Sequence, residues 1–275
     1  MKKVTNRDGS DWRGRLRSIS GRHNALVKEL RKAFAAGTAT SEGLCAIEGL
    51  RILEEAIRSG VKFQTVFFSA SAEAKAERLL PQIGAHVETL LLPDTLFASI
   101  VPSTAPQGVA ALVHCKTWSL DEVLAKSQSG PLLVIAGVQD PGNLGTILRS
   151  AEAFGAGGAI LAEGTVSPFN PKVVRASSGS GFRFPMAKAT LPEALEKLRG
   201  RRLIATSSHK GVPINQADLT GPIAIFIGNE GAGLPREVIS AVDEVVVIPH
   251  SPKVESLNAG VAASIVLYEA RRQRK

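Results

Sequence analysis

The residues best suited to chemistry stand where apolar runs of the sequence give way to glycine-rich turns or helix starts. In α/β proteins such positions lie at the carboxyl ends of strands, where ligands bind. Amide, hydroxyl and carboxylate groups there can orient a substrate hydroxyl, and a guanidinium can stabilise developing negative charge. The candidates for these roles are Asn143, Arg149, Glu230, Ser256 and Asn258.

The first block runs from Asp140 into a helix that carries Arg149 about two turns in. Gly142 and Gly145 let the backbone and a ligand approach closely. Asn143 at the helix start can cap free N–H groups or present its amide to a substrate. The alternative is structural: Asn143 is then only a cap, and Arg149 only a surface salt-bridge partner.

The second block places Glu230 in an Asn-Glu-Gly turn directly after an apolar run. Its carboxylate can hold a hydroxyl or pair with Arg149 and Asn143, unless it simply points to solvent. The third block enters a long helix at about Ser256, which either caps that helix or serves the site. Four apolar residues of this segment fall at helical spacing, which is typical of core or dimer packing: Leu257, Val261, Ile265 and Tyr268.

Near-continuous apolar runs alternate with helical segments through the second half of the chain, which predicts a parallel sheet covered on both faces. The predicted strands are 132–136, 159–161, 184–187, 203–205, 223–227 and 245–248.

The first half predicts a smaller α/β unit at 18–117, after a basic flexible arm at 1–17. Residues 118–130, with one amphipathic helix, predict a linker to the catalytic unit at 131–275. Within the smaller unit we expect helices at 24–35, 50–58, 73–80 and 94–100 and strands at 44–47, 65–68, 87–91 and 108–114.

Positive charge is concentrated at the two ends of the chain. The net charge of +8 consists of +7 over residues 1–32, +3 over residues 269–275 and −2 over the rest. This distribution favours a nucleic-acid partner, although a solvated basic tail is the alternative.

Other classes of protein are disfavoured by what the sequence lacks. The N-terminus has no apolar leader and no run is long enough for a membrane helix, so we expect a cytosolic protein. Cys45 and Cys115 lack zinc-ligand spacing and predict small buried residues. The sequence has no HExxH motif, no clustered metal ligands, no P-loop and no GxGxxG unit, so we expect no metal site and no dinucleotide site.

Together the three blocks resemble the motifs of the SpoU/TrmH methyltransferases, members of the SPOUT superfamily that methylate ribose 2'-hydroxyls in RNA with S-adenosylmethionine. The similarity is strong over residues 132–271, where Asn143-Leu144-Gly145 and Arg149 are followed by Ala151-Glu152-Ala153-Phe154-Gly155-Ala156. It implies an α/β fold with a parallel sheet and a C-terminal trefoil knot, a rare exception to unknotted topology. It also implies a homodimer and a smaller N-terminal domain similar to ribosomal protein L30e, which binds the RNA substrate.

The resemblance assigns roles residue by residue. Arg149 is the catalytic arginine, and we favour an electrostatic role because a guanidinium rarely gives up its proton. Asn143, Glu230, Ser256 and Asn258 complete the catalytic set. The implied cofactor contacts are Thr206, Ser207, Gly228, Asn229, Gly231, Ile248, Pro249, Leu257 and Asn258. The implied RNA contacts are Arg22, Asn24, Lys28, Arg51, Lys172 and Arg175.

Two departures from the family pattern follow Ile248-Pro249, where relatives usually carry methionine and then glycine. This chain has His250 and, two residues on, Pro252. We interpret the histidine as a packing variant rather than a catalytic base. Ribosomal RNA is the favoured substrate and tRNA the alternative. A rival hypothesis from another class is a non-catalytic RNA-binding or ribosome-assembly protein that kept the fold and lost the cofactor.

Overall fold

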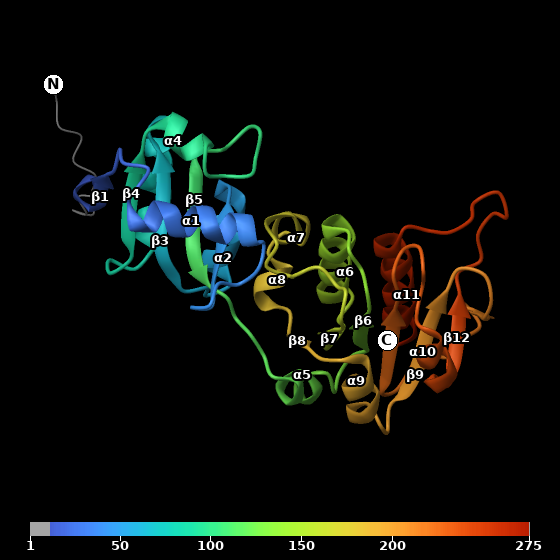
Figure 1. The fold of residues 1–275 in the computed structure, drawn as a ribbon. Helices are drawn as coiled ribbons and strands as arrows, with labels where there is room; N and C mark the ends of the chain where they lie inside the picture. The colour runs from blue at the N-terminus through green and yellow to red at the C-terminus, as the bar shows by residue number, and fades with distance from the viewer. Residues whose placement is uncertain (1–11, 275) are drawn as a thin grey trace. The chain divides into compact units, whose positions relative to one another are not determined.

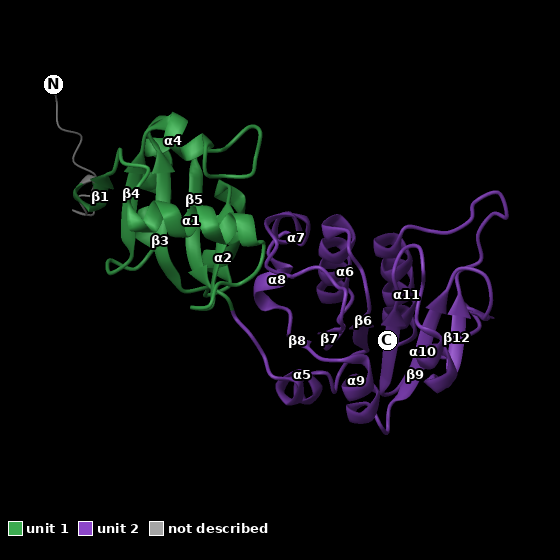
Figure 2. Cartoon of the chain, viewed as in Figure 1, with its two compact units in different colours: residues 1–115 green, residues 116–275 purple. Residues whose placement is uncertain are grey.

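The computed structural model describes residues 12–274, which form two compact units divided between Cys115 and Lys116 (Figure 2). The segment 118–130, predicted as a linker, contains helix α5 (Leu120–Lys126). Val123 of this helix is fully buried in a core cluster of the second unit. In the structure this segment is therefore part of the second unit.

The first unit is built on a five-stranded sheet with the order β1-β4-β3-β5-β2. β1, β4 and β3 are parallel, whereas β5 runs antiparallel to both β3 and β2. All the helices and strands predicted for this unit are confirmed to within a few residues. The bounds after β1 are α1 (Ala25–Ala36), β2 (Leu44–Glu48), α2 (Leu50–Arg58), β3 (Phe63–Ser69), η2 (Ala70–Ala72), α3 (Glu73–Leu79), η3 (Leu80–Gln82), β4 (Glu88–Leu92), α4 (Asp94–Ala98) and β5 (Val109–His114).

The basic arm predicted for residues 1–17 is too long. Residues 1–11 lie outside the described part of the chain, but Trp12–Arg15 form a short 3-10 helix, η1, and Leu16–Ser18 form strand β1. The Arg15 guanidinium donates to the carbonyl oxygens of Leu80 and Gly84 at 2.8 and 2.9 Å. These backbone contacts and the β1 pairing, which local composition does not reveal, attach the segment to the sheet.

The second unit is built on a seven-stranded sheet with the order β10-β12-β9-β11-β6-β7-β8, in which every pairing is parallel. All six strands predicted here are confirmed, and β10 is additional. The bounds after α5 are β6 (Leu132–Ile135), α6 (Pro141–Ala153), β7 (Gly158–Leu161), α7 (Pro171–Ala176), α8 (Ser180–Arg183), β8 (Met186–Lys188), α9 (Leu191–Lys197), β9 (Arg202–Ser207), β10 (Val212–Pro213), β11 (Ile223–Ile227), α10 (Arg236–Ala241), β12 (Glu244–Val247) and α11 (Ala259–Gln273).

Alternating residues of the central strands bury their side chains on opposite faces of this sheet. Leu133 and Ile135 of β6 face a core completed by α6 and α11. Leu132 and Val134 face the core formed with α5, α9 and α10. Figure 1 labels these helices and the strands of the sheet. Because both faces of the sheet are covered, its strands are continuous apolar runs in the sequence. This is why they could be predicted from the sequence.

Gly145 has a packing role and not the ligand contact expected from the sequence. A Cβ atom at this position would lie 2.3 Å from the Cβ of Ala176 and 3.0 Å from the backbone nitrogen of Ser177. Gly145 therefore lets α6 and α7 approach at backbone distance. This contact holds the helix that carries Asn143 and Arg149.

We expect Gly145→Ala to lower the free energy of unfolding by about 1–3 kcal/mol, because the overlap with α7 outweighs the better helix propensity of alanine. Urea unfolding followed by circular dichroism measures the change. Thr146→Ala, at the exposed neighbouring position, is the matched control and should stay within about 0.5 kcal/mol of the parent. A Gly145→Ala protein as stable as the parent would remove the close approach as a source of stability.

Residues 12–274 contain no helix with both the length and the apolar character needed to cross a membrane.

Candidate active site

Three loops meet at the carboxyl edge of the second sheet. One joins β6 to α6, one follows β11, and one joins β12 to α11. β11 lies between β6 and β9, and β12 lies beside β9, so the ends of these strands are neighbours in space. The three sequence blocks are thus brought to one edge, as the parallel-sheet prediction requires.

A chain of side-chain hydrogen bonds joins one residue from each block. The Nδ2 amide of Asn258 donates to Oδ1 of Asn143 at 2.7 Å, and Nδ2 of Asn143 donates to Oε1 of Glu230 at 2.8 Å. Asn143 is only 8% exposed. The oxygen and the nitrogen of the Asn143 amide thus both have hydrogen-bond partners, which fixes this side chain. The fixed amide in turn holds the Glu230 carboxylate in place.

Of the two asparagines Asn143 and Asn258, only Asn258 is a helix N-cap. Asp140, not Asn143, is the N-cap of α6, and its carboxylate accepts from the Asn143 backbone N–H at 2.8 Å. Asn258 is the N-cap of α11, and its Oδ1 accepts from the Val261 N–H at 3.2 Å. Asn258 therefore both starts the last helix and orients Asn143.

The helix start predicted at Ser256 is wrong, because α11 begins at Ala259. Ser256 is an exposed residue of the preceding loop. Its side chain belongs to the lining of a cavity rather than to the helix cap. Ser256 is therefore not the N-cap of this helix, and Asn258 has that role.

Asn229 builds the turn that carries Glu230. Its Oδ1 accepts from the backbone N–H groups of Gly231 and Ala232, each at 2.9 Å, and its Nδ2 donates to the Gly137 carbonyl at 2.7 Å. The same side chain thus closes its own turn and ties that turn to the loop after β6. This bridge sets the position of Glu230 relative to Asn143.

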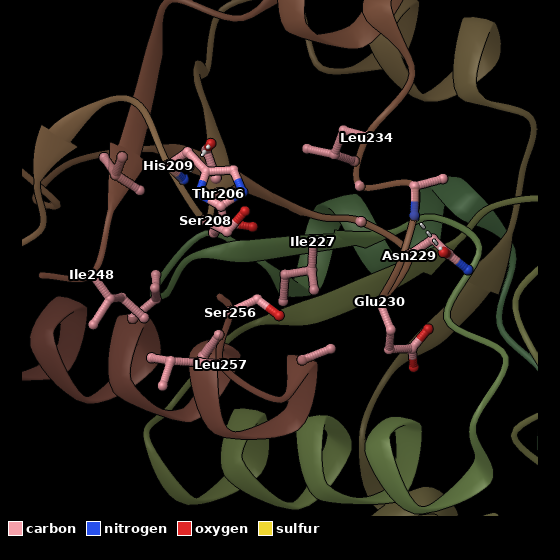
Figure 3. Close-up of a pocket in the computed structure, with 18 of the residues that line it drawn as sticks. Thr206, Ser208, His209, Ile227, Asn229, Glu230, Leu234, Ile248, Ser256 and Leu257 are labelled. Carbon is pink, nitrogen blue, oxygen red and sulfur yellow. Dashed lines mark hydrogen bonds between the residues drawn. The ribbon is translucent and has the colours of Figure 1, made fainter. Parts of the chain in front are cut away.

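A cavity of about 380 Å³ opens beside these loops (Figure 3). Among the described residues it collects most of the cofactor contacts implied by resemblance, together with Glu230 and Ser256. Pro249 and Asn258 are not part of its lining. The predicted residues that line it are Thr206, Ser207, Gly228, Asn229, Gly231, Ile248 and Leu257.

The cavity fits a ligand with an aromatic ring and a polar tail. Apolar side chains such as Ile227 and Leu257 form one part of its wall, and the hydroxyl-bearing Ser256 belongs to another. A Cβ on Gly228 would lie 2.5 Å from the carbonyl carbon of Gly233, so only glycine fits there. These properties suit S-adenosylmethionine, which combines an adenine ring with charged groups.

Sequence reasoning missed part of this lining. Ser208 and His209 follow the end of β9 and contribute to the cavity, as does Leu234. Their place directly after a buried strand was the available signal. His250, interpreted as a packing variant, also lines the cavity, and its Nδ1 lies 2.8 Å from the Ile248 carbonyl oxygen.

Arg149 lies apart from the chain of amides. It is exposed on the second turn of α6, and its one hydrogen bond to a described residue runs from Nη1 to Ser178 Oγ at 3.4 Å. Ser178 has φ +49°, a left-handed conformation unusual for a serine. Arg149 forms no salt bridge with an acidic residue among residues 12–274, so the alternative of a surface salt-bridge partner is not supported.

The predicted RNA contacts are mostly exposed. Arg22, Lys28 and Arg51 are exposed on the first unit, and Lys172 is exposed at the start of α7 on the second. Arg175 is half-buried.

Asn24 differs from the other predicted RNA contacts because it caps α1. Its Oδ1 accepts from the N–H groups of Leu26 and Val27 at 3.0 and 3.4 Å. The side-chain oxygen of Asn24 is therefore engaged by the helix.

Among residues 12–274, no cluster of three or more His, Cys, Asp or Glu side chains is arranged to hold a metal ion. In the first unit, a side-chain hydrogen bond with Cys115 and, after it, burial raise the pKa of Cys45. Cys45 is buried as predicted, whereas Cys115 is half-buried.

Comparison with known families identifies both units. Residues 130–268 match the SpoU rRNA Methylase family, and residues 24–111 match the MRM3-like substrate binding domain. The chain is 30% identical over 259 residues to the 23S rRNA (guanosine(2553)-2'-O)-methyltransferase RlmP of Bacillus subtilis, covering 93% of this chain and 100% of that protein. It is 32% identical to the 23S rRNA (uridine(2479)-2'-O)-methyltransferase of Streptomyces viridochromogenes, covering 86% and 85%.

Solved structures agree with this assignment. The AdoMet-bound rRNA methyltransferase of Sinorhizobium meliloti superimposes with a TM-score of 0.81 at 30% identity, covering 94% of this chain and 98% of that one. The SpoU methyltransferase AviRb of Streptomyces viridochromogenes, also solved with AdoMet, superimposes with a TM-score of 0.77 at 29% identity, covering 91% and 99%. The trefoil knot stays a prediction. The matches over both units and the arrangement of the three loops place the chain in the SpoU rRNA methylase family.

Proposed function

We propose that this protein transfers a methyl group from S-adenosylmethionine to a ribose 2'-hydroxyl of ribosomal RNA. The observation that supports this most is the hydrogen-bonded set Asn258, Asn143 and Glu230, held beside a cavity suited to the cofactor. Two relatives named as 23S rRNA 2'-O-methyltransferases support ribosomal RNA over tRNA. Such a substrate implies a cytoplasmic location.

Bound S-adenosylmethionine supplies a methyl group that its sulfonium already activates. The protein therefore has to align the hydroxyl and stabilise the charge that develops on its oxygen. Glu230 is suited to accept the hydrogen bond of the 2'-hydroxyl, because Asn143 occupies Oε1 and Oε2 has no partner among the described residues. Asn258 and Asn143 act as positioning residues for this carboxylate.

Arg149 acts electrostatically in this mechanism. Its exposure leaves the guanidinium free to bind an RNA phosphate or the developing 2'-alkoxide. It is not suited to be the base, because a guanidinium stays protonated in proteins.

The cofactor is held by main chain and small side chains. Gly228, Ile248 and Leu257 are the proposed backbone contacts, and Thr206 and Ser207 close the cavity from the end of β9. Thr206 is itself fixed by a 3.0 Å hydrogen bond from its hydroxyl to the Phe226 carbonyl. The fixed lining favours a preformed binding site.

RNA binding is proposed for the first unit and for α7. The match to a substrate binding domain and the exposed Arg22, Lys28 and Arg51 support this role. Because phosphate contacts release counterions, RNA affinity should fall steeply as salt rises.

Mapping of 2'-O-methylated nucleotides by mass spectrometry, in ribosomal RNA from cells with and without the gene, tests the proposal. One ribose methylation should disappear with the gene and return when purified protein and S-adenosylmethionine are added to the unmodified RNA. A well-folded protein that binds RNA but shows no S-adenosylmethionine binding by calorimetry would instead support the non-catalytic assembly protein.

A homodimer is proposed from the outer face of α11. Val261, Ile265 and Tyr268 form an apolar stripe, with Val261 46% and Tyr268 56% exposed, so the stripe does not belong to the core of this unit. Phe154, at the end of α6, contacts the Tyr268 ring edge-on with centroids 5.7 Å apart. An exposed apolar surface on adjoining helices is typical of a subunit interface.

We expect Ile265→Glu to weaken dimerisation more than tenfold, because it would bury an unpaired charge in the contact. Sedimentation equilibrium measures the dissociation constant, and Ile265→Leu is the apolar control. Circular dichroism must show that both variants are folded. A parent protein that is monomeric at high concentration would contradict the proposed dimer.

A further inference from the structure

A second cavity, of about 410 Å³, opens at the carboxyl ends of β7 and β8. One wall is the loop 162–166 after β7, and the other is formed by the end of β8 and the first turn of α9. It lies at the same edge of the parallel sheet as the cofactor cavity, on the other side of the β6 loop. None of its lining residues has a role in the methyl transfer described above.

The wall of this cavity is tied by hydrogen bonds to the catalytic loops. Thr165 Oγ1 accepts from the Gly137 N–H at 3.0 Å and donates to the Ile135 carbonyl at 2.9 Å. The Gly137 carbonyl in turn accepts from Asn229 Nδ2, in the turn that carries Glu230. A continuous set of hydrogen bonds thus runs from the wall of the second cavity to the turn that carries Glu230.

The charged groups of the lining argue against a phosphate as the occupant. Two exposed carboxylates, Glu163 and Glu193, stand in the lining against the single ammonium of Lys188. Carboxylates accept hydrogen bonds and repel phosphate oxygens. The part of an RNA that suits them is a base edge with N–H donors.

Glu163 is held in place for such a contact. Its Oε2 accepts from the backbone N–H of Leu191 at 3.3 Å, at the start of α9. A carboxylate has about four acceptor positions, so this bond leaves capacity for a ligand.

We propose that this cavity binds an unpaired guanine of the RNA substrate, an inference that rests on the proposed function. Guanine presents N1–H and the N2 amino group side by side, and both can donate to the Glu163 carboxylate. Uracil flanks its one N–H with acceptors, and adenine and cytosine place an acceptor beside their amino group, which a carboxylate repels. Lys188, in the same lining, supplies a donor for guanine O6. Single-stranded RNA is commonly recognised through such base edges.

The test compares two fluorescent RNA probes, oligouridine with one central guanosine and the same RNA with inosine, which lacks only the N2 amino group. Binding to the full chain is measured by anisotropy, with the cofactor cavity filled by saturating S-adenosylhomocysteine. We expect about tenfold tighter binding of the guanosine probe, the usual effect of a charge-assisted hydrogen bond. Glu163→Gln should abolish this preference, and Glu196→Gln, on α9 but outside the cavity, should keep it.

Equal affinity for the two probes, or a preference that survives Glu163→Gln, overturns the guanine site. The proposed function is judged separately, by methyl transfer to ribosomal RNA and by binding of S-adenosylhomocysteine. Glu163→Gln should leave that cofactor affinity unchanged. In methyl transfer it should raise KM for RNA more than it lowers kcat, which a general loss of structure would not do.

Discussion

Replacing Arg149 with alanine is expected to lower methyl transfer by about a hundredfold or more and to leave S-adenosylmethionine affinity unchanged. The side chain is exposed and does not line the cofactor cavity, so its loss removes no contact with the cofactor. It does remove the positive charge available to the RNA phosphate or the 2'-alkoxide. Single-turnover transfer of a labelled methyl group and calorimetry measure the two effects.

Arg199→Ala is the control, because Arg199 is an exposed arginine of the same unit away from the three loops. It should retain nearly full activity. Arg149→Lys keeps the charge and loses the planar fork, so an intermediate rate is expected if bidentate phosphate binding contributes. Turnover of Arg149→Ala at the parent rate would remove this residue from the mechanism.

Gly228→Val should abolish measurable cofactor binding, with a loss of affinity of about a hundredfold or more. A Cβ at Gly228 would lie 2.5 Å from the Gly233 carbonyl carbon and 2.7 Å from the Leu234 nitrogen. The backbone of the turn would have to move, and both contacted residues line the cavity. Calorimetry with S-adenosylmethionine measures the loss, and methyl transfer should fall with it.

The same turn offers a matched control in Gly231→Ala. A Cβ at Gly231 has only Asn229 Oδ1 nearby, at 3.6 Å, an ordinary contact. Because it causes no backbone overlap, this variant should lose much less cofactor affinity than Gly228→Val. If Gly228→Val binds as tightly as Gly231→Ala, the close approach of the turn does not shape the cavity.

The strands and the candidate residues could be predicted because both leave local signals. Strands buried on two faces are short apolar runs, and the polar residues directly after them mark the functional edge. Such positions, together with the resemblance to the family motifs, indicated Asn143, Glu230 and Asn258. In the structure hydrogen bonds join Asn258 to Asn143 and Asn143 to Glu230.

The partners of these residues could not be predicted in the same way. Which strand lies beside which is a long-range property, so the position of β11 between β6 and β9 has no local signature. Gly145 illustrates the limit: a glycine beside a functional asparagine suits a ligand contact and a helix contact equally. The structure shows the helix contact, because a Cβ on Gly145 would lie only 2.3 Å from the Cβ of Ala176.

Loop residues without regular spacing were the other failure. Ser208 and His209 line the cofactor cavity, and their place directly after β9 is the one sequence signal that distinguishes them from other loop residues. The sequence located the apolar stripe of Val261, Ile265 and Tyr268 but did not show what it contacts, because core residues and interface residues of a helix have the same spacing. Because these side chains are exposed in the structure, they are not part of the core of this unit.

The hydrogen bond between Asn143 and Asn258 joins positions 115 residues apart. During translation the first of these side chains is made well before the second, which is the N-cap of α11. Until α11 has docked, Asn143 lacks the donor of this hydrogen bond. A frameshift that removes α11 should therefore yield a product that does not methylate RNA.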